Sequence, residues 1–170
     1  GRRRVTVCVN ALSVYLVDRR VPWVEETLAG RSLEERIGQL FFPVGMSGDD
    51  GNICRMVRTL KPCGIMYRSC PAKEAAEAHA TIQEISRIPM FLAANLESGG
   101  DGLVTEGTSF GSNMNPAATG DPEVARRLGV VCAREAGAVG GNMAFAPVVD
   151  INFNCNNPIA NIRSYGDRPE

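Results

Sequence analysis

The most constraining feature of the sequence is a short continuous apolar run, Met90-Phe91-Leu92-Ala93-Ala94, that begins directly after Pro89. An apolar run of this length without polar alternation is typical of a strand buried on both faces, as in a parallel sheet. It ends in Asn95-Leu96-Glu97-Ser98-Gly99-Gly100, a polar, glycine-rich stretch that indicates a loop. The sequence therefore predicts at least one buried strand of the kind found in the parallel sheets of α/β proteins.

Segments with helical periodicity surround this strand. Ser32 and Glu35 form a capping box, the start of a helix with Leu33, Ile37 and Leu40 on one face. Three further helices are predicted, over residues 50–60, 71–87 and 121–139. Three further short apolar runs predict strands, over residues 40–44, 65–67 and 142–149. One helix followed by repeated strands and helices predicts a parallel α/β fold with right-handed crossovers.

Four strands with intervening helices fit two architectures. One is an open doubly wound sheet, and the other is the N-terminal half of a (β/α)8 TIM-type barrel. Periodicity does not separate them. A complete barrel takes about 250 residues, so a barrel of 170 residues would be incomplete. The closing segment Asp167-Arg168-Pro169-Glu170 is typical of a helix start, and we interpret it as a chain that stops before a further helix.

Residues 1–30 are predicted to be a leader or N-terminal extension, and residues 31–170 the α/β domain, which is a partial barrel domain if the second architecture holds. Arg2-Arg3-Arg4 precedes a mostly apolar run from Val5 to Val17, so residues 2–17 could be a remnant export signal, although no small-residue cleavage site follows. We favour a β-strand or a disordered leader. The run is too short for a membrane span. The compartment stays open between the cytoplasm and export.

Charge and cysteine usage exclude several function classes. The net charge is −1, from 18 basic and 19 acidic residues, so no large field of one sign favours a nucleic-acid partner or anionic lipid. The six cysteines form no C-x-x-C pair, and His79 is the single histidine. We therefore expect free thiols, no metal site and no cofactor. His79 is interpreted as a surface or helix-packing residue.

Polar side chains follow the last two predicted strands. Asn95 and Glu97 follow the run at 90–94, and asparagines, aspartates and Arg163 are concentrated in residues 150–167. Amides, carboxylates and guanidinium groups can bind pairs of sugar hydroxyls. The same residue types also simply favour loops, and composition leaves both interpretations open. Phosphate binding fits less well, because the glycine-rich stretch 137–141 ends a helix rather than starting one.

A series of motifs in fixed order resembles glycoside hydrolase family 3. The motifs lie at Ser32-Leu33-Glu34-Glu35-Arg36-Ile37-Gly38-Gln39-Leu40, Lys61-Pro62-Cys63-Gly64-Ile65-Met66, Asn113-Met114 with 117–123, 145–151, and Asn157-Pro158 with 161–167. The resemblance covers residues 32–170 and is closest to the bacterial β-N-acetylhexosaminidase-like branch. It implies a (β/α)8-type barrel that hydrolyses β-linked glycosides, β-N-acetylglucosaminides or β-glucosides, from non-reducing ends with retention.

The resemblance also implies site residues. The family's nucleophile, an Asp on a late strand, and its acid/base His would both lie beyond Glu170, so we predict no catalytic residue here and an inactive chain by itself. The family's strand-three carboxylate falls on Asn95, and its loop arginine falls on Arg163. Both are predicted to bind the carbohydrate substrate, an oligosaccharide or cell-wall-derived glycoside. Glu97 and Asp150 match motif positions and are predicted to orient the loops. An amide at Asn95 leaves the sugar open.

Two alternatives remain. The chain could belong to a non-catalytic carbohydrate-binding relative, which Asn95 suggests, or it could be a small complete α/β protein. Downstream sequence with a Lys-His pair, a following His loop and a late-strand Asp would identify the enzyme. A complete protein should unfold cooperatively as a soluble monomer, whereas a half barrel should expose sheet edges and aggregate.

Overall fold

Four short parallel strands form one sheet in the computed structural model, which describes residues 22–45 and 50–168. They are β1 (Val44–Gly45), β2 (Gly64–Tyr67), β3 (Phe91–Ala94) and β4 (Met143–Ala144), and their spatial order is β1-β2-β3-β4. A doubly wound sheet reverses its strand order at a switch point, whereas an unbroken sequential order is that of a TIM-type barrel. The described strands therefore have the topology of the first half of such a barrel.

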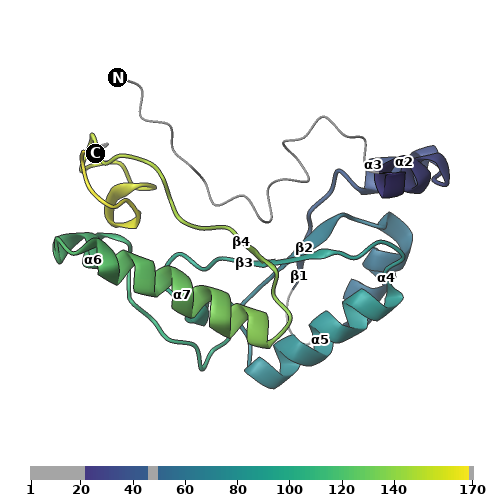
Figure 1. Ribbon diagram of the computed structural model, residues 1–170, viewed down its shortest axis with the longest axis horizontal. Coiled ribbons are helices and arrows are strands. Elements are labelled where there is room, and N and C mark those ends of the chain that lie inside the picture. The colour runs from purple at the N-terminus through teal and green to yellow at the C-terminus, as the bar shows by residue number, and fades with distance from the viewer. Residues whose placement is uncertain (1–21, 46–49, 169–170) are drawn as a thin grey trace.

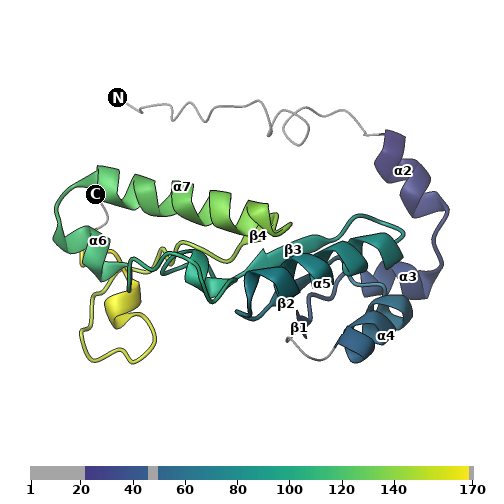
Figure 2. The same ribbon diagram turned by 90° about the horizontal axis from the view of Figure 1, so that it is seen from below.

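Three helices fill the crossovers and lie along one side of the sheet (Figure 1). They are α4 (Asp50–Leu60), α5 (Ala72–Ile85) and α7 (Pro122–Ala138). Helices α2 (Pro22–Ala29) and α3 (Leu33–Gly38) precede β1, and α6 (Met114–Ala118) precedes α7. Two 3-10 turns, η1 (Gly100–Gly102) and η2 (Asn161–Arg163), lie in the long loops. Figure 2 shows that η2 and α6 lie side by side, away from α2 and α3.

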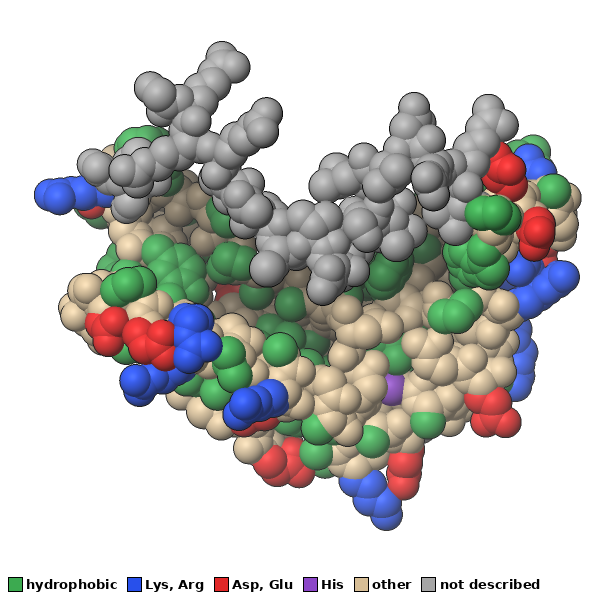
Figure 3. All heavy atoms as spheres, in the orientation of Figure 1, with side chains coloured by type: hydrophobic (Ala, Val, Ile, Leu, Met, Phe, Trp, Pro, Cys, Tyr) green, Lys and Arg blue, Asp and Glu red, His purple; other side chains and the backbone are tan. Residues whose placement is uncertain are grey.

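Side chains alternate across the sheet. Ile65 and Tyr67 of β2 and Leu92 and Ala94 of β3 belong to the buried core that the helices cover. The opposite face carries a row in register, Val44, Met66, Ala93 and Met143. Val44 is 50% exposed and Met143 is 37% exposed, and hydrophobic side chains gather in the hollowed middle of this side (Figure 3). In a closed barrel, side chains of this face fill the interior.

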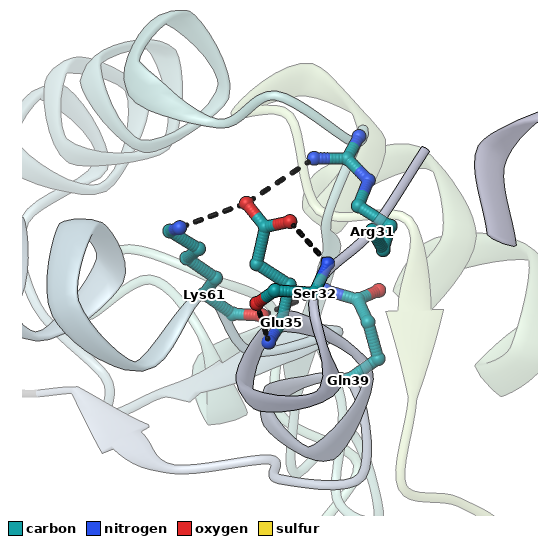
Figure 4. Close-up of polar contacts among 5 residues, drawn as sticks. All are labelled: Arg31, Ser32, Glu35, Gln39 and Lys61. Atoms are coloured by element: carbon teal, nitrogen blue, oxygen red, sulfur yellow. Dashed lines mark hydrogen bonds and ion pairs between the residues drawn. The ribbon is translucent and has the colours of Figure 1, made fainter. Parts of the chain in front are cut away.

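The first helix after α2 is fixed at its start as the capping box predicts. The Ser32 hydroxyl accepts a hydrogen bond from Glu35 N at 3.2 Å, and Glu35 Oε2 accepts one from Ser32 N at 3.1 Å. Glu35 also accepts a hydrogen bond from Lys61 Nζ at 2.8 Å and lies 3.7 Å from Arg31 (Figure 4). The Lys61 bond is the main reason that the pKa of Glu35 falls to about 2. These contacts fasten α3 to the turn before β2.

Several predicted boundaries move. The strand expected at 40–44 begins only at Val44, and Leu40 is 83% exposed, so the prediction of a buried strand there is wrong. The strand expected at 142–149 shortens to Met143–Ala144. Its neighbour β3 ends at Ala94, whose carbonyl accepts the last bond from Phe145 N at 3.0 Å. A strand can extend only as far as its neighbour offers backbone N–H and C=O groups for pairing. The apolar residues of the run itself do not indicate that limit.

Two helices arise where none was expected. Helix α6 forms between the predicted strand at 90–94 and the predicted helix at 121–139, and α2 forms inside the predicted N-terminal extension. The possible export signal at 2–17 lies outside the described residues. No helix in the described part of the chain is both long and apolar enough to cross a membrane. Residues 22–45 and 50–168 contain no group of three or more His, Cys, Asp or Glu side chains placed to hold a metal ion.

His79 packs between helices, and the alternative of a surface position is wrong. The residue is 1% exposed. Its Nδ1 lies 2.8 Å from the Val139 carbonyl oxygen after α7, and its ring meets Tyr67 edge-on at 5.4 Å between centroids. Val139 is 60 positions away in sequence, so no local pattern could indicate this partner. The contact ties α5 to the turn that leads into β4.

Burial makes His79 a source of acid sensitivity. Desolvation lowers its pKa below the ordinary 6.5 and outweighs the bond to the Val139 carbonyl, which raises the pKa. The unfolded chain therefore binds the proton more readily than the folded one. The free energy of unfolding should fall as the pH decreases from 6.5 to the lower pKa of the folded state, and His79 should add no pH dependence above 6.5. Proton NMR can titrate the His79 imidazole in the folded and the urea-unfolded longer protein, with its signal assigned by comparison with a His79→Gln variant. A folded midpoint at or above the unfolded one would contradict this prediction.

Candidate functional site

The candidate site lies where strands β3 and β4 end. The carboxyl ends of parallel barrel strands share one edge, where sites are built from the loops that follow. Asn95 is the first residue after β3, and the long loop after β4 contains η2 and Arg163. In both views this loop returns to the neighbourhood of α6 (Figures 1 and 2). Two segments that are far apart in sequence thereby meet at the edge of the sheet.

A bidentate ion pair joins these loops. Arg163 Nε donates to Glu97 Oε2 at 2.8 Å, and Nη2 donates to Oε1 at 2.7 Å. The Arg163 bond lowers the pKa of Glu97, while Glu97, with a smaller contribution from Asp150, raises the pKa of Arg163. Both groups are therefore charged at neutral pH. Because the Arg163 side chain is 44% exposed, the pair orients the guanidinium more than it stabilises the fold.

The pair borders an open polar hollow of about 440 Å³. Its lining residues all carry polar groups or expose backbone, and they are Asn95, Glu97, Ser98, Gly111, Ser112, Asn113 and Arg163. The structure thus brings together three of the four predicted site residues. The fourth, Asp150, is exposed and does not line the hollow, although its charge acts on Arg163.

The loop after β3 folds back on itself, so that the backbone at Gly102 touches the backbone of Asn95. A Cβ on Gly102 would lie 1.7 Å from the Asn95 carbonyl oxygen, so the two backbone segments touch directly. Glu135 of α7 accepts hydrogen bonds from Thr108 N at 2.8 Å and from Thr108 Oγ1 at 2.6 Å. Phe110 N then donates to the Ser98 carbonyl at 2.6 Å. These contacts place residues 111–113 beside the hollow.

Sequence reasoning did not assign the other four lining residues, Ser98, Gly111, Ser112 and Asn113, to the site, and Asn113 is the one with the most distinctive contact. Asn113 is 1% exposed and donates from Nδ2 to the Arg163 carbonyl at 2.7 Å. It attracted notice only as part of a motif, because an asparagine before a short helix reads as an ordinary turn residue. Its partner lies 50 positions later, and no local signal indicates that pairing.

Two other hollows have a different character. One of about 450 Å³ lies between α7 and the open side of β4, and its lining is mostly apolar, including Leu128, Cys132 and Met143. Such a lining suits packing by other apolar elements. Another, of about 260 Å³, lies beside Lys61 and Pro62, which precede β2. It is at the amino ends of the strands, where barrel proteins do not place their sites.

The fold and the site define this chain as part of a TIM-type barrel domain with a polar site at the carboxyl ends of its strands. The model of the glycosyl hydrolase family 3 N terminal domain matches residues 32–170. The chain therefore belongs to glycosyl hydrolase family 3. This match confirms the resemblance that the sequence motifs carry.

Three relatives show how far the likeness extends. The chain is 42% identical over 158 residues to a beta-N-acetylglucosaminidase/beta-glucosidase of Cellulomonas fimi, covering 93% of this chain and 28% of that protein. The structure of the beta-glucoside phosphorylase BglX bound to 2FGlc matches with a TM-score of 0.81 at 40% identity, covering 87% of this chain and 27% of that one. A family 3 beta-N-acetylglucosaminidase from Paenibacillus sp. str. FPU-7 matches with a TM-score of 0.71 at 30% identity, covering 82% and 28%. The chain spans about a quarter of the length of these relatives.

Proposed function

We propose that the protein containing this segment hydrolyses β-linked glycosides, β-N-acetylglucosaminides or β-glucosides, from their non-reducing ends. This chain supplies part of the surface that binds the sugar. The observation that carries the proposal is the Arg163 guanidinium, held by Glu97 beside Asn95 at the carboxyl ends of the strands. The names of the relatives support this substrate class.

The charges of the hollow favour a neutral ligand. The positive charge of Arg163 is balanced by the negative charge of Glu97, so the pair carries no net charge that would attract an anion. Arg163 and the exposed Asn95 still offer guanidinium donors and an amide with both donor and acceptor character. Sugar hydroxyls are neutral and can both donate and accept, and adjacent pairs of them match these planar groups. A glycoside is the ligand class that this combination fits.

Glu97 is not suited to proton transfer in this arrangement. Its carboxylate is engaged by Arg163 through two hydrogen bonds, which lower its pKa. A general acid needs a pKa raised towards the working pH. We therefore assign Glu97 to orienting Arg163. In the proposal, the carboxylate nucleophile and the acid/base group of a retaining glycosidase come from outside this chain.

A second candidate is transfer of the glycosyl group to inorganic phosphate. The 40% identity to a beta-glucoside phosphorylase favours it. In that reaction the bond from the sugar's C1 to the aglycone oxygen breaks, that oxygen gains a proton, and C1 bonds to a phosphate oxygen instead of to water. A third candidate is non-catalytic sugar binding, which the amide of Asn95 in place of a carboxylate suggests.

The test uses the longer protein that carries this segment with the rest of the barrel. We expect it to release p-nitrophenol from the β-N-acetylglucosaminide or the β-glucoside, but not from the matching α-anomers. Proton NMR should show the β-anomer as the first sugar product. Assays with and without inorganic phosphate distinguish the acceptors, because a sugar 1-phosphate would identify the phosphorylase. Sugar binding without turnover would favour the non-catalytic relative, and neither binding nor turnover would refute the proposal.

A further inference from the structure

Arg163 is held at two points by residues from the other loop. Glu97 binds its guanidinium, and Asn113 Nδ2 donates to its backbone carbonyl at 2.7 Å. Within η2, Arg163 N also donates to the Ala160 carbonyl at 2.7 Å. The side chain and the backbone of Arg163 are therefore fixed separately. The backbone contact fixes the position of the Arg163 main chain, and the Glu97 pair fixes the position of its guanidinium group.

Asn113 is buried at a cost. Its Oδ1 is shielded from solvent and has no hydrogen-bond partner among residues 22–45 and 50–168. A buried carbonyl without a partner destabilises a fold, whereas an apolar side chain of similar shape avoids that penalty. Leucine at this position would avoid the penalty but would leave the Arg163 carbonyl without this donor. What the amide adds over an apolar side chain is therefore its Nδ2 hydrogen bond to the Arg163 carbonyl.

We propose that Asn113 is a positioning residue of the sugar-binding site. Its hydrogen bond to the Arg163 carbonyl holds η2 in the position from which the guanidinium reaches Glu97 and borders the hollow. Asn113 acts through Arg163, and its amide group need not touch the sugar. This inference rests on the proposed function, because it assigns Asn113 to the same site.

Stability and function should separate in the variant Asn113→Leu of the longer protein. The thermal midpoint should stay nearly unchanged, because the removal of the unpartnered Asn113 carbonyl offsets the loss of the donor to the Arg163 carbonyl. The specificity constant kcat/KM should fall by about tenfold to a hundredfold, because small displacements of a binding group are costly. The control is Asn115→Leu, an exposed asparagine two residues later whose side chain does not reach Arg163. It should leave kcat/KM unchanged.

A double variant tests whether Asn113 acts through Arg163. In an Arg163→Ala background, Asn113→Leu should cause no further loss of kcat/KM. An equal loss in both backgrounds, or no loss in the wild-type background, would overturn the inference. If Asn113→Leu fails to fold, Asn113→Ala removes the donor without adding bulk or charge and should give the same loss and the same lack of additivity. An Arg163→Ala protein with unchanged kcat/KM would instead refute the site in the proposed function, and Asn113 with it.

Discussion

Replacing Arg163 with alanine should lower kcat/KM of the longer protein by about 30-fold to nearly a thousandfold, equivalent to about 2–4 kcal/mol of transition-state binding. The variant removes a charged donor from a sugar hydroxyl and leaves the Glu97 carboxylate without its cation. Steady-state kinetics on the best β-glycoside measures the effect. Arg163→Lys should recover only part of the loss, because an ammonium cannot reproduce the two parallel bonds of a guanidinium.

The matched control is Arg126→Ala. Arg126 also forms a bidentate pair, with Glu123 at 2.6 Å for both bonds, but on the exposed surface of α7. Its removal should leave kcat/KM unchanged, since an exposed pair on a helix contributes little beyond local helix stability. An Arg163→Ala variant that behaves like Arg126→Ala would contradict the role of Arg163 in the site.

Replacing Gly102 with alanine should reduce the free energy of unfolding by about 3 kcal/mol, because the new methyl group cannot be accommodated without moving backbone. The added Cβ would lie 1.7 Å from the Asn95 carbonyl oxygen and 2.7 Å from its carbon. A clash with backbone is not relieved by a change of rotamer. Denaturant unfolding of the longer protein measures the loss, and a raised KM should accompany it because Asn95 is displaced.

Gly137→Ala is the control for this substitution. Gly137 lies in the last turn of α7, and apart from the backbone of its own helix no described atom lies within 4 Å of the position that its Cβ would take. Alanine there should stabilise the protein by about 0.5–1 kcal/mol, because it favours the helix and restricts the unfolded chain. If Gly102→Ala were as stable as Gly137→Ala, the close approach of the two loop segments would be disproved.

The capped helix start at Ser32 was the most predictable feature of the fold. Ser32 and Glu35 form the capping box that the sequence predicts, and Asp121 caps α7 in a similar way just before Pro122. A cap is a contact over two or three residues, so it is fully encoded locally. Strand ends were less predictable. The apolar run after residue 142 continues past Ala144, but the ladder does not, because pairing depends on a neighbour that the run does not contain.

The candidate site divides in the same way. Local patterns are enough to place Asn95 and Glu97 after a buried strand and Arg163 after the next strand, and so to predict one shared edge. The pairing of Glu97 with Arg163, the position of Asp150 outside the hollow, and the contact of Asn113 with the backbone of Arg163 become visible only in the folded chain. Periodicity and caps depend on near neighbours in sequence. The Glu97 and Asn113 contacts instead join residues 50 or more positions apart, and their loops must first fold against α6 and α7.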